Sequence, residues 1–318
     1  MDNSTRKVVL VGCGMVGNSF LYSAINKGIA QQYVLIDAFR QAAEGNAIDL
    51  SDAATVLENR FSIIKAGDYY DCKDADLIVI TAGRPQRDKE TRLDMVADNA
   101  RIIQDIALQI KASGFKGVTL IASNPVDVLA SVYQKVTGFA KNKVISSGTT
   151  LDSARLRRLV GNKLNIPPDR VNAYVLGEHG DSSVSVWSKA SIMQKSIAYF
   201  VAEGKLTEKD LKDMHQQMIK MAYKIIALKK STFYGIGACL SLIAKAILND
   251  EKLTFLVGAK CEGEYNVTGT HIGVPAIIGI NGIEEIIEWK LTKEEQDKFE
   301  KSEAQLHETL TVALLALK

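Results

Sequence analysis

The stretch KVVLVGCGMVG, residues 7–17, decides the fold of this chain. Residues 8–11 form a continuous apolar run rich in β-branched side chains, which is typical of a strand covered on both faces of a parallel sheet. The glycine motif of residues 12–17 follows, and a helical pattern runs through residues 18–27. A second buried run, residues 33–37, ends on an acid 20 residues after the last glycine. This order predicts a dinucleotide-binding βαβ unit.

Each part of the motif has a physical role in binding a dinucleotide. Gly12 permits the tight turn, Gly14 lets the pyrophosphate approach, and Gly17 lets helix and strand pack closely. The pyrophosphate then lies at the helix N-terminus, whose free N–H groups and dipole attract anions. Asp37 accepts hydrogen bonds from the adenosine ribose and repels a 2′-phosphate, which favours NAD over NADP, although Arg40 nearby opposes this preference. The alternative is a glycine turn without a ligand.

Strands and helices continue to alternate through the first half of the chain. Apolar runs at residues 76–81, 118–122 and 143–146 predict further strands, and residues 93–112 have helical spacing. Alternation of this kind predicts an α/β fold with a Rossmann-type, doubly wound parallel sheet, whose ligands bind at the carboxyl ends of the strands. We therefore expect an NAD-binding Rossmann domain in residues 1–147.

The second half, residues 148–318, is expected to form a mixed α+β substrate domain that carries the catalytic residues. Residues 171–176 predict a strand, and two later apolar runs predict antiparallel strands. Thr207 and Asp210 resemble a capping box at the head of a long helix. Thr232 lies at a break before an apolar helix, where it suits an N-cap.

Composition limits the class of protein. The chain has 318 residues, of which 47% are hydrophobic and 24% charged, which suggests about two globular domains. Its net charge of +2, with the signs interspersed, offers no basic surface to nucleic acid or membrane lipid. Four cysteines without a CxxC pair argue for a reducing compartment and against a metal site. Without a secretory region or an apolar stretch of about 18 residues, we expect a cytoplasmic protein.

The hexapeptide GEHGDS, residues 177–182, carries the strongest candidate for proton chemistry. His179 is one of four histidines, and imidazole titrates near neutrality. Upstream, Asp152 and Arg155 are three residues apart on an expected helix and so share one face. Less specific readings remain open, namely a polar turn for the hexapeptide and a surface ion pair for the two charged residues. The other histidines lack this setting, and His215 is expected at the surface.

Residues 84–92 connect an expected strand to an expected helix, and six of the nine are charged. None is a large apolar residue, so the segment cannot belong to the core. It is either a solvated connector or a lid that brings cationic groups over a bound anion. Composition leaves these two readings equal.

Together these motifs resemble the lactate/malate dehydrogenase family, and within it the bacterial-type lactate enzymes. The resemblance runs essentially from end to end. It is carried by VVLVGCG (8–14), NPVD (124–127), LDSAR (151–155), GEHGDS (177–182) and IGVPA (272–276). The family implies NAD as cofactor, a small 2-keto or 2-hydroxy acid as substrate, no metal, and a homotetramer.

The resemblance implies that His179, Asp152 and Arg92 are catalytic. His179 protonates the carbonyl oxygen of the keto acid, and Asp152 hydrogen-bonds the other ring nitrogen and raises the histidine pKa. Arg155 binds the substrate carboxylate with two parallel hydrogen bonds. Arg92, on the lid, polarises the carbonyl as negative charge develops on its oxygen.

The same resemblance implies two sets of binding residues. The substrate contacts are Gln86, Arg92, Asn124, Arg155 and Thr232. The NAD contacts are Gly12, Gly14, Met15, Val16, Gly17, Asp37, Thr81, Ala82, Gly83, Asn99, Ser123, Asn124 and Ile236. Among these, Asn124 is expected near the reacting carbon and Ile236 against the nicotinamide face.

Residue 86 is expected to decide the substrate. The family has glutamine here in lactate enzymes and arginine in malate enzymes, and this chain has Gln86. A neutral amide suits pyruvate and leaves the second carboxylate of oxaloacetate unpaired in a closed site. The loop departs from the usual pattern, because Asp88 and Lys89 replace the common Pro-Gly and Arg84 and Arg87 flank the glutamine. A shift in register could present either arginine to a dicarboxylate, so a malate or broader L-2-hydroxyacid dehydrogenase is the alternative.

A protein from another class also deserves comparison, namely a redox sensor that binds NAD(H) without turnover. Such a binder does not require a histidine, an aspartate and two arginines in the positions of the family. The sequence therefore favours an enzyme.

Regulation by fructose 1,6-bisphosphate is a separate question. Bacterial lactate enzymes that respond to it are similar in an arginine two residues after the carboxylate-binding one and in a histidine shortly before the catalytic one. Arg157 matches the arginine, and Tyr174 occupies the position expected for the histidine. Tyrosine brings no positive charge, so the resemblance implies a weak or absent response.

Overall fold

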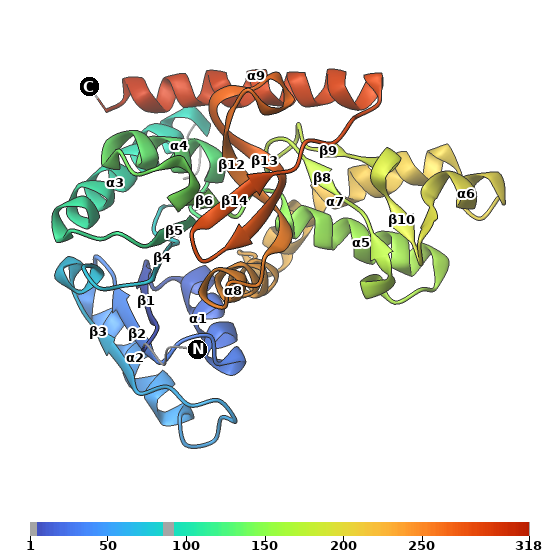
Figure 1. The fold of residues 1–318 in the computed structure, drawn as a ribbon. Coiled ribbons are helices and arrows are strands. Elements are labelled where there is room, and N and C mark those ends of the chain that lie inside the picture. Colours follow the sequence, from blue (N-terminus) through green and yellow to red (C-terminus); the bar gives the residue numbers. More distant parts are fainter. Residues whose placement is uncertain (1–4, 85–91, 318) are drawn as a thin grey trace.

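The computed structural model of the chain describes residues 5–84 and 92–317, the side chains of residues 92–94 excepted (Figure 1). A sheet of nine strands runs through it in the order β14-β13-β12-β6-β5-β4-β1-β2-β3. Its parallel strands are β1 (Lys7–Val11), β2 (Gln32–Ile36), β3 (Ile63–Ala66), β4 (Leu77–Ile80), β5 (Val118–Ile121) and β6 (Val144–Ser146). The helices between them are α1 (Met15–Lys27), α2 (Arg40–Ala53), α3 (Arg92–Ser113) and α4 (Val126–Thr137). The expected doubly wound parallel sheet is confirmed.

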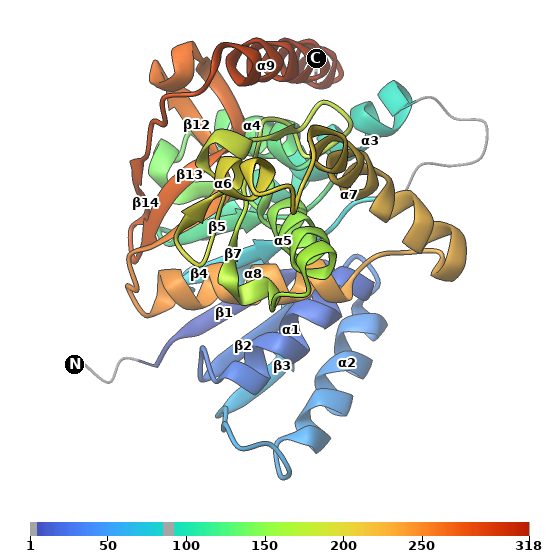
Figure 2. The ribbon, with the colours of Figure 1, turned by 90° about the vertical axis from the view of Figure 1, so that its right-hand side faces the viewer.

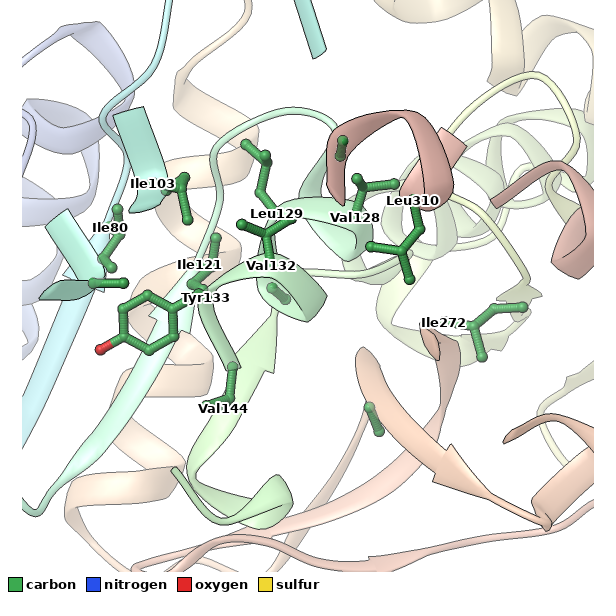
Figure 3. Close-up of a cluster of buried hydrophobic side chains, with 14 of the residues drawn as sticks. Ile80, Ile103, Ile121, Val128, Leu129, Val132, Tyr133, Val144, Ile272 and Leu310 are labelled. Carbon is green, nitrogen blue, oxygen red and sulfur yellow. The ribbon is translucent and has the colours of Figure 1, made fainter. Parts of the chain in front are cut away.

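The central strands are covered on both faces, as their apolar runs predict. Val9 and Val11 belong to a core formed with α3, α4 and the C-terminal helix α9 (Lys293–Leu315). Val8 and Leu10 belong to a second core, formed with α1 and α8 (Tyr234–Leu248). Figure 3 shows part of the first core, where Leu310 of α9 lies near Val128 of α4. Burial on both faces explains why β1 is a continuous apolar run instead of an alternating one.

The first helix begins at Met15, three residues before the start that the sequence pattern predicts. Its N-cap is Gly14, which has extended backbone and makes no side-chain cap hydrogen bond. Because glycine has no side chain to mark a cap, the pattern alone does not show where the helix starts. The first turn of the helix therefore lies inside the glycine motif.

Two elements of the first half, α2 and β3, are not evident from the sequence pattern. β3 is an edge strand with alternating exposure, and its Ile63 is 43% exposed. The buried residues of α2 are two small ones, Ala43 and Ala47. Neither element offers a long apolar run, and the place of β3 follows from its pairing with β2.

Strands from the second half extend the same sheet. β12 (Leu253–Glu262) and β13 (Thr268–Gly279) are the two antiparallel strands that the sequence predicts, and β14 (Gly282–Ile286) adds a third that it does not. β12 also pairs with β6, where Gly258 lies opposite Ser146. At the turn between the halves, Gly148 has φ +47°, and a Cβ there would lie 2.5 Å from the carbonyl carbon of Val257. Backbone pairing and close packing therefore join the two halves.

The other α-helices and strands of the second half form its outer part, on the right of Figure 1. Helices α5 (Thr150–Leu164), α6 (Ile197–Ala202) and α7 (Glu208–Lys229) lie beside two small sheets of order β11-β10-β7 and β8-β9. Their strands are β7 (Val171–Asn172), β8 (Val175–Leu176), β9 (Val184–Ser185), β10 (Ser191–Ile192) and β11 (Lys195–Ser196). Within the described residues of both halves, the short 3₁₀ helices are η1 (Tyr69–Cys72), η2 (Lys141–Lys143), η3 (Pro168–Arg170), η4 (Trp187–Lys189) and η5 (Glu264–Asn266).

Two local predictions in this region are wrong. Residues 171–176 form two strands instead of one, because β7 pairs with β10 and β8 pairs with β9. Thr232 is not the N-cap of α8, since Phe233 occupies that position. The capping box of α7 is confirmed: Asp210 N–H donates to Thr207 Oγ1 (3.1 Å) and Thr207 N–H donates to Asp210 Oδ2 (3.0 Å).

Packing of α8 along α1 connects the second half to the glycine motif (Figures 1 and 2). The two helices approach closely at Gly237, where a Cβ would lie 2.5 Å from Ser19 Oγ. The start of α8 therefore lies beside the start of α1. In the described part of the chain, no helix combines the length and the apolar character needed to cross a membrane.

Gly17→Ala is expected to destabilise the protein, because the added Cβ would collide with the carbonyl oxygen of Gly12 and lie 2.8 Å from Thr81 Oγ1. A loss of about 1–3 kcal/mol of unfolding free energy is expected from such overpacking. Gly45→Ala is the matched control, because no atom of the described chain lies within 4 Å of a Cβ placed there in α2. That change is expected to gain roughly 0.5–1 kcal/mol. Urea unfolding of both variants measures this, and equal stabilities would contradict the packing argument.

Candidate active site

The hexapeptide of residues 177–182 joins β8 to β9 and lies against β13. Gly177 N–H donates to the carbonyl oxygen of Gly273 (2.9 Å), and Gly273 N–H donates to that of Gly177 (3.0 Å). Gly177 has φ +88°, a backbone conformation that favours glycine. These contacts determine where the chain leaves β8 and turns toward His179.

Helix α5 is held to β8 by two further hydrogen bonds. Thr149 Oγ1 donates to the carbonyl oxygen of Val175, and Val175 N–H donates to Ser153 Oγ (3.0 Å). Both hydroxyls flank Asp152 in the sequence. The first turn of α5 and the end of β8 are therefore fixed relative to each other.

Asp152 and His179 meet across this contact. Nδ1 of His179 lies 2.5 Å from Oδ2 of Asp152, and the side chains are 25% and 6% exposed, respectively. The carboxylate of Asp152 raises the pKa of His179, against the opposing effect of burial. Among the described residues, Nε2 of His179 has no hydrogen-bond partner. The ring is thus held through one nitrogen and presents the other, as an acid/base group requires.

Arg155 completes a buried group of charges. Its Nη1 lies 3.3 Å from Oδ1 of Asp152, and its side chain is 8% exposed. Burial alone would raise the pKa of Asp152, but the charges of His179 and Arg155 outweigh it, so that the pKa is lowered. Reading Asp152 and Arg155 as a surface ion pair is therefore wrong. A buried guanidinium beside the acid/base group is suited to bind a carboxylate.

The glycine motif has the properties that a dinucleotide needs. Among the described residues, nothing lies within 4 Å of a Cβ placed on Gly14, so in this part of the structure the space above the start of α1 is open to a ligand. α1 has neither a side-chain cap nor an acid in its first turn, which leaves its N–H groups for an anion. Asp37 accepts from Cys13 N–H (2.7 Å) and Phe39 N–H (2.9 Å) and is half-buried. The residues present therefore fit the pyrophosphate and ribose of NAD.

Side chains at the ends of β4 and β5 hold this turn in place. Thr81 Oγ1 donates to the carbonyl oxygen of Gly12 (2.7 Å), and Ser123 Oγ donates to that of Ala82 (2.5 Å). Gly12 has φ +102°, and a Cβ there would lie 2.5 Å from the nitrogen of Ala82. The ends of β1, β4 and β5 therefore form one packed edge, as expected for a cofactor site of a parallel sheet.

Asn99, on α3, connects two loops at this edge. It is 2% exposed, and its Oδ1 accepts from Arg84 N–H (2.9 Å). Its Nδ2 donates to the carbonyl oxygens of Arg84 (3.2 Å) and Asn124 (3.0 Å). The side-chain amide of Asn99 is therefore hydrogen-bonded to the protein itself. It fixes Arg84 and Asn124, which follow β4 and β5, relative to each other.

Both halves of the chain match models of one protein family. Residues 6–146 match the lactate/malate dehydrogenase NAD-binding domain, and residues 149–314 match the lactate/malate dehydrogenase α/β C-terminal domain. The chain belongs to the lactate/malate dehydrogenase family. The expected family, and NAD as the cofactor, are thereby confirmed.

Relatives within the family resemble the chain over nearly its whole length. It is 63% identical to an L-lactate dehydrogenase of Mycoplasma capricolum subsp. capricolum, with 98% of each chain covered. It is 46% identical to L-lactate dehydrogenase 1 of Lactobacillus acidophilus, with 97% of this chain and 95% of the relative covered. Among solved structures, the minor L-lactate dehydrogenase of Enterococcus mundtii in its ligand-bound form superposes with a TM-score of 0.95 at 42% identity, covering 96% of this chain and 98% of that one.

Other site residues that the family resemblance implies lie on elements other than the loop of His179. Thr232 and Ile236 are half-buried at the start of α8, beside α1, and Asn124 is exposed after β5. In the described part of the chain, no hydrogen bond joins these three to His179 or Asp152. Gln86 and the side chain of Arg92 lie outside the described residues, although α3 begins at position 92.

Two features near the site are not apparent from the sequence. The guanidinium of Arg84 is paired with Asp98, through Nε (2.9 Å) and Nη2 (2.6 Å) to Oδ2. Asp127 of the NPVD motif is 1% exposed beneath the loop of His179, and burial raises its pKa to about 7 although Ser146 Oγ donates to it (2.5 Å). In the sequence, only the NPVD motif points to Asp127, and the motif does not show which groups Asp127 contacts.

The two other buried histidines have structural surroundings. His271 is fully buried and bonded to Ser131 Oγ (3.0 Å), and burial lowers its pKa to about 3. The expectation that His215 lies at the surface is wrong, because it is half-buried and its Nδ1 contacts Ser185 Oγ (2.8 Å). Burial lowers the pKa of His215 as well, so neither ring shares the raised pKa of His179.

The Asp152–His179 pair predicts the pH dependence of keto-acid reduction. Reduction uses the protonated ring, and the pKa of His179 is raised, so the rate is expected to be constant at low pH and to fall as the pH rises through that pKa. Asp152→Asn removes the charge that raises the pKa, which moves the fall to lower pH and lowers kcat by about 10²–10⁴-fold. Profiles of kcat/KM against pH for both proteins measure this. An unchanged midpoint in the variant would contradict the role of Asp152.

Proposed function

We propose that this chain catalyses the NAD-dependent interconversion of pyruvate and L-lactate, the reaction of an L-lactate dehydrogenase. The observation that carries the proposal is the buried group of His179, Asp152 and Arg155, in which a ring nitrogen and a guanidinium remain available to a small acid. The family and the names of the relatives support it.

The proposed mechanism assigns one task to each charged group. Arg155 binds the carboxylate of pyruvate and so orients its carbonyl. His179 donates the proton on Nε2 to the carbonyl oxygen and becomes neutral, while Asp152 stabilises the charged ring beforehand and keeps it oriented. NADH, when bound, supplies the hydride to the carbonyl carbon. In the reverse direction neutral His179 takes the hydroxyl proton of lactate, and Arg92 is proposed to stabilise charge on the oxygen.

The two halves of the chain are proposed to divide this work. Residues 1–147 would hold NAD at the glycine motif and Asp37, and residues 148–318 would supply the proton donor and Arg155, which binds the substrate carboxylate. Support comes from the hydrogen bonds that Thr81 and Ser123 make at the cofactor edge. Because β12 pairs with β6, the two sites are held on one sheet.

Pyruvate is proposed over oxaloacetate because of Gln86 and because of the state of Arg84. In the structure the Arg84 guanidinium lies against Asp98, with 15% of its side chain exposed. Turning it toward a dicarboxylate would break this ion pair and leave Asp98 without that partner. The malate or broader 2-hydroxyacid alternative therefore depends on Arg87, which lies outside the described residues, as does Gln86.

A weak or absent response to fructose 1,6-bisphosphate is also proposed. Tyr174 brings no positive charge to the segment beside Arg157, and its ring packs on Trp289 with the ring centroids 4.9 Å apart. The exposed residue in this segment is Asn172. It is neutral like Tyr174, and residues 171–176 include no cation to join Arg157 in binding a phosphate.

We further propose a homotetramer in the cytoplasm. Large apolar side chains that are 46–71% exposed on α1, α2, α7 and α8 support self-association; they are Met15, Tyr22, Ile48, Tyr223, Tyr234 and Leu242. Figure 2 shows α1, α2 and α8 on one side of the molecule. The four cysteines are free and buried, which supports a reducing compartment.

The proposed function is tested by NADH oxidation with pyruvate, oxaloacetate and branched 2-keto acids. The highest kcat/KM is expected with pyruvate. His179→Asn keeps a polar side chain but cannot deliver the proton, so kcat is expected to fall by at least about 10²-fold. NADH binding, followed by its fluorescence, is the control and should be retained. Parental turnover in His179→Asn would refute the assigned mechanism, and a preference for oxaloacetate would refute the substrate.

Gln86→Arg is expected to move the preference toward oxaloacetate, because the new guanidinium pairs with the second carboxylate. The ratio of kcat/KM for oxaloacetate to that for pyruvate is expected to rise by about two orders of magnitude or more. Gln86→Asn, which stays neutral, is the matched control. An unchanged ratio in Gln86→Arg would show that another residue determines the preference between the two substrates.

A further inference from the structure

Ser302, on α9, lies against the loop that carries His179. Its side chain is completely buried, and its Oγ accepts a hydrogen bond from the backbone N–H of Glu178 (2.8 Å). Ser302 and Glu178 are 124 residues apart in sequence. The C-terminal helix therefore reaches the residue that directly precedes His179.

Ser182, which follows His179 by three residues, joins the same contact. Its Oγ donates to Oε2 of Glu178 (2.6 Å) and lies 3.0 Å from Oγ of Ser302. A hydroxyl has one proton to donate, and that of Ser182 goes to the carboxylate. The bond between the two serines therefore uses the proton of Ser302, which donates to Ser182.

The three hydrogen bonds form a closed ring with a single direction. Glu178 N–H donates to Ser302, Ser302 O–H donates to Ser182, and Ser182 O–H donates to the carboxylate of Glu178. Glu178 is 2% exposed, so its charge and its amide both depend on partners within the protein. Bonds in such a chain polarise and strengthen one another, and each is made at low dielectric.

The glycines of the loop make room for this ring. A Cβ on Gly177 would lie 2.5 Å from Oγ of Ser302, and a Cβ on Gly180 would lie 3.2 Å from the carboxyl carbon of Glu178. Gly177 also carries the left-handed backbone, with φ +88°. The two glycines beside Glu178 and His179 thus allow the helix and the carboxylate to approach the loop.

We propose that Ser302, Glu178 and Ser182 form a positioning unit for His179, and that Ser302 is the residue through which α9 holds the proton donor in place. Asp152 fixes the ring of His179 from one side, through Nδ1. The hydrogen bonds among Ser302, Glu178 and Ser182 fix the backbone of His179 from the other side, because Glu178 directly precedes His179 and Ser182 follows it by three residues. Two constraints of different origin then determine where Nε2 lies. This inference rests on the proposed function, since it concerns the same histidine.

The consequence is a specific effect on turnover. Ser302→Ala removes two of the three bonds and leaves the buried N–H of Glu178 without that acceptor, while no group that contacts substrate or cofactor changes. A small displacement of His179 lowers kcat by at least about tenfold, because proton transfer requires near hydrogen-bond geometry. Binding of NADH at the glycine motif, in the other half of the chain, stays within about twofold of the parent.

Ser302→Ala, Ser182→Ala and the double variant test the proposal in the full-length protein. kcat and KM for pyruvate, NADH affinity and the thermal midpoint are measured for each. Both single variants are expected to lose kcat by at least about tenfold, and the double variant to lose no more than the worse single one, because the ring acts as a unit. Ser182→Thr keeps the hydroxyl at a half-buried position and is expected to restore turnover.

Thr309→Ala is the matched control on the same helix, because Thr309 Oγ1 donates to the carbonyl oxygen of Gln305 (2.9 Å). It is expected to keep the parental kcat. If Ser302→Ala lowers the thermal midpoint while kcat stays parental, or if the single effects on kcat simply multiply in the double variant, the positioning role is overturned. A parent without pyruvate turnover would instead overturn the proposed function, so the two failures are distinguishable.

Discussion

The hydrogen bond between Asp152 and His179 is the interaction on which the site depends. Asp152 is almost completely buried, and a lone carboxylate there would be costly to desolvate. His179 and Arg155 stabilise it, and in turn the carboxylate raises the pKa of His179 and pairs with the guanidinium of Arg155. The buried carboxylate of Asp152 is therefore the group that holds both cationic side chains in the site. Because they come from α5 and from the loop after β8, the fold must hold these two segments together.

Three elements, β13, α5 and α9, bond to the segment around His179. β13 bonds to the backbone of Gly177, while α5 bonds to Val175 two residues earlier. The hairpin that includes β13 belongs to the same sheet as the glycine motif, because β12 pairs with β6. Hydride donor and proton donor are thus expected to be carried by one rigid layer, to which α9 adds the contact of Ser302.

Sequence patterns predict most of the parallel sheet, since strands buried on both faces must be apolar throughout. The same patterns miss β3, which is an edge strand with alternating exposure, and α2, whose buried residues are small. They also join β7 and β8 into one strand, because a run of apolar residues does not reveal that the chain changes partner strands at residue 173. In the site, the residue types of His179, Asp152 and Arg155 are evident, but their burial and mutual contacts are not.

By itself the sequence determined the dinucleotide motif, the alternation of strands and helices, and the residues that could carry charge and protons. These are local properties, set by side-chain chemistry and by spacings of a few residues along one element. Only the tertiary structure decided that Asp152 meets His179, that Asp98 holds Arg84, and that Ser302 closes a ring with Glu178. Such contacts join residues 14 to 124 positions apart, and they depend on how α5, α3 and α9 pack against the sheet, which no local spacing encodes.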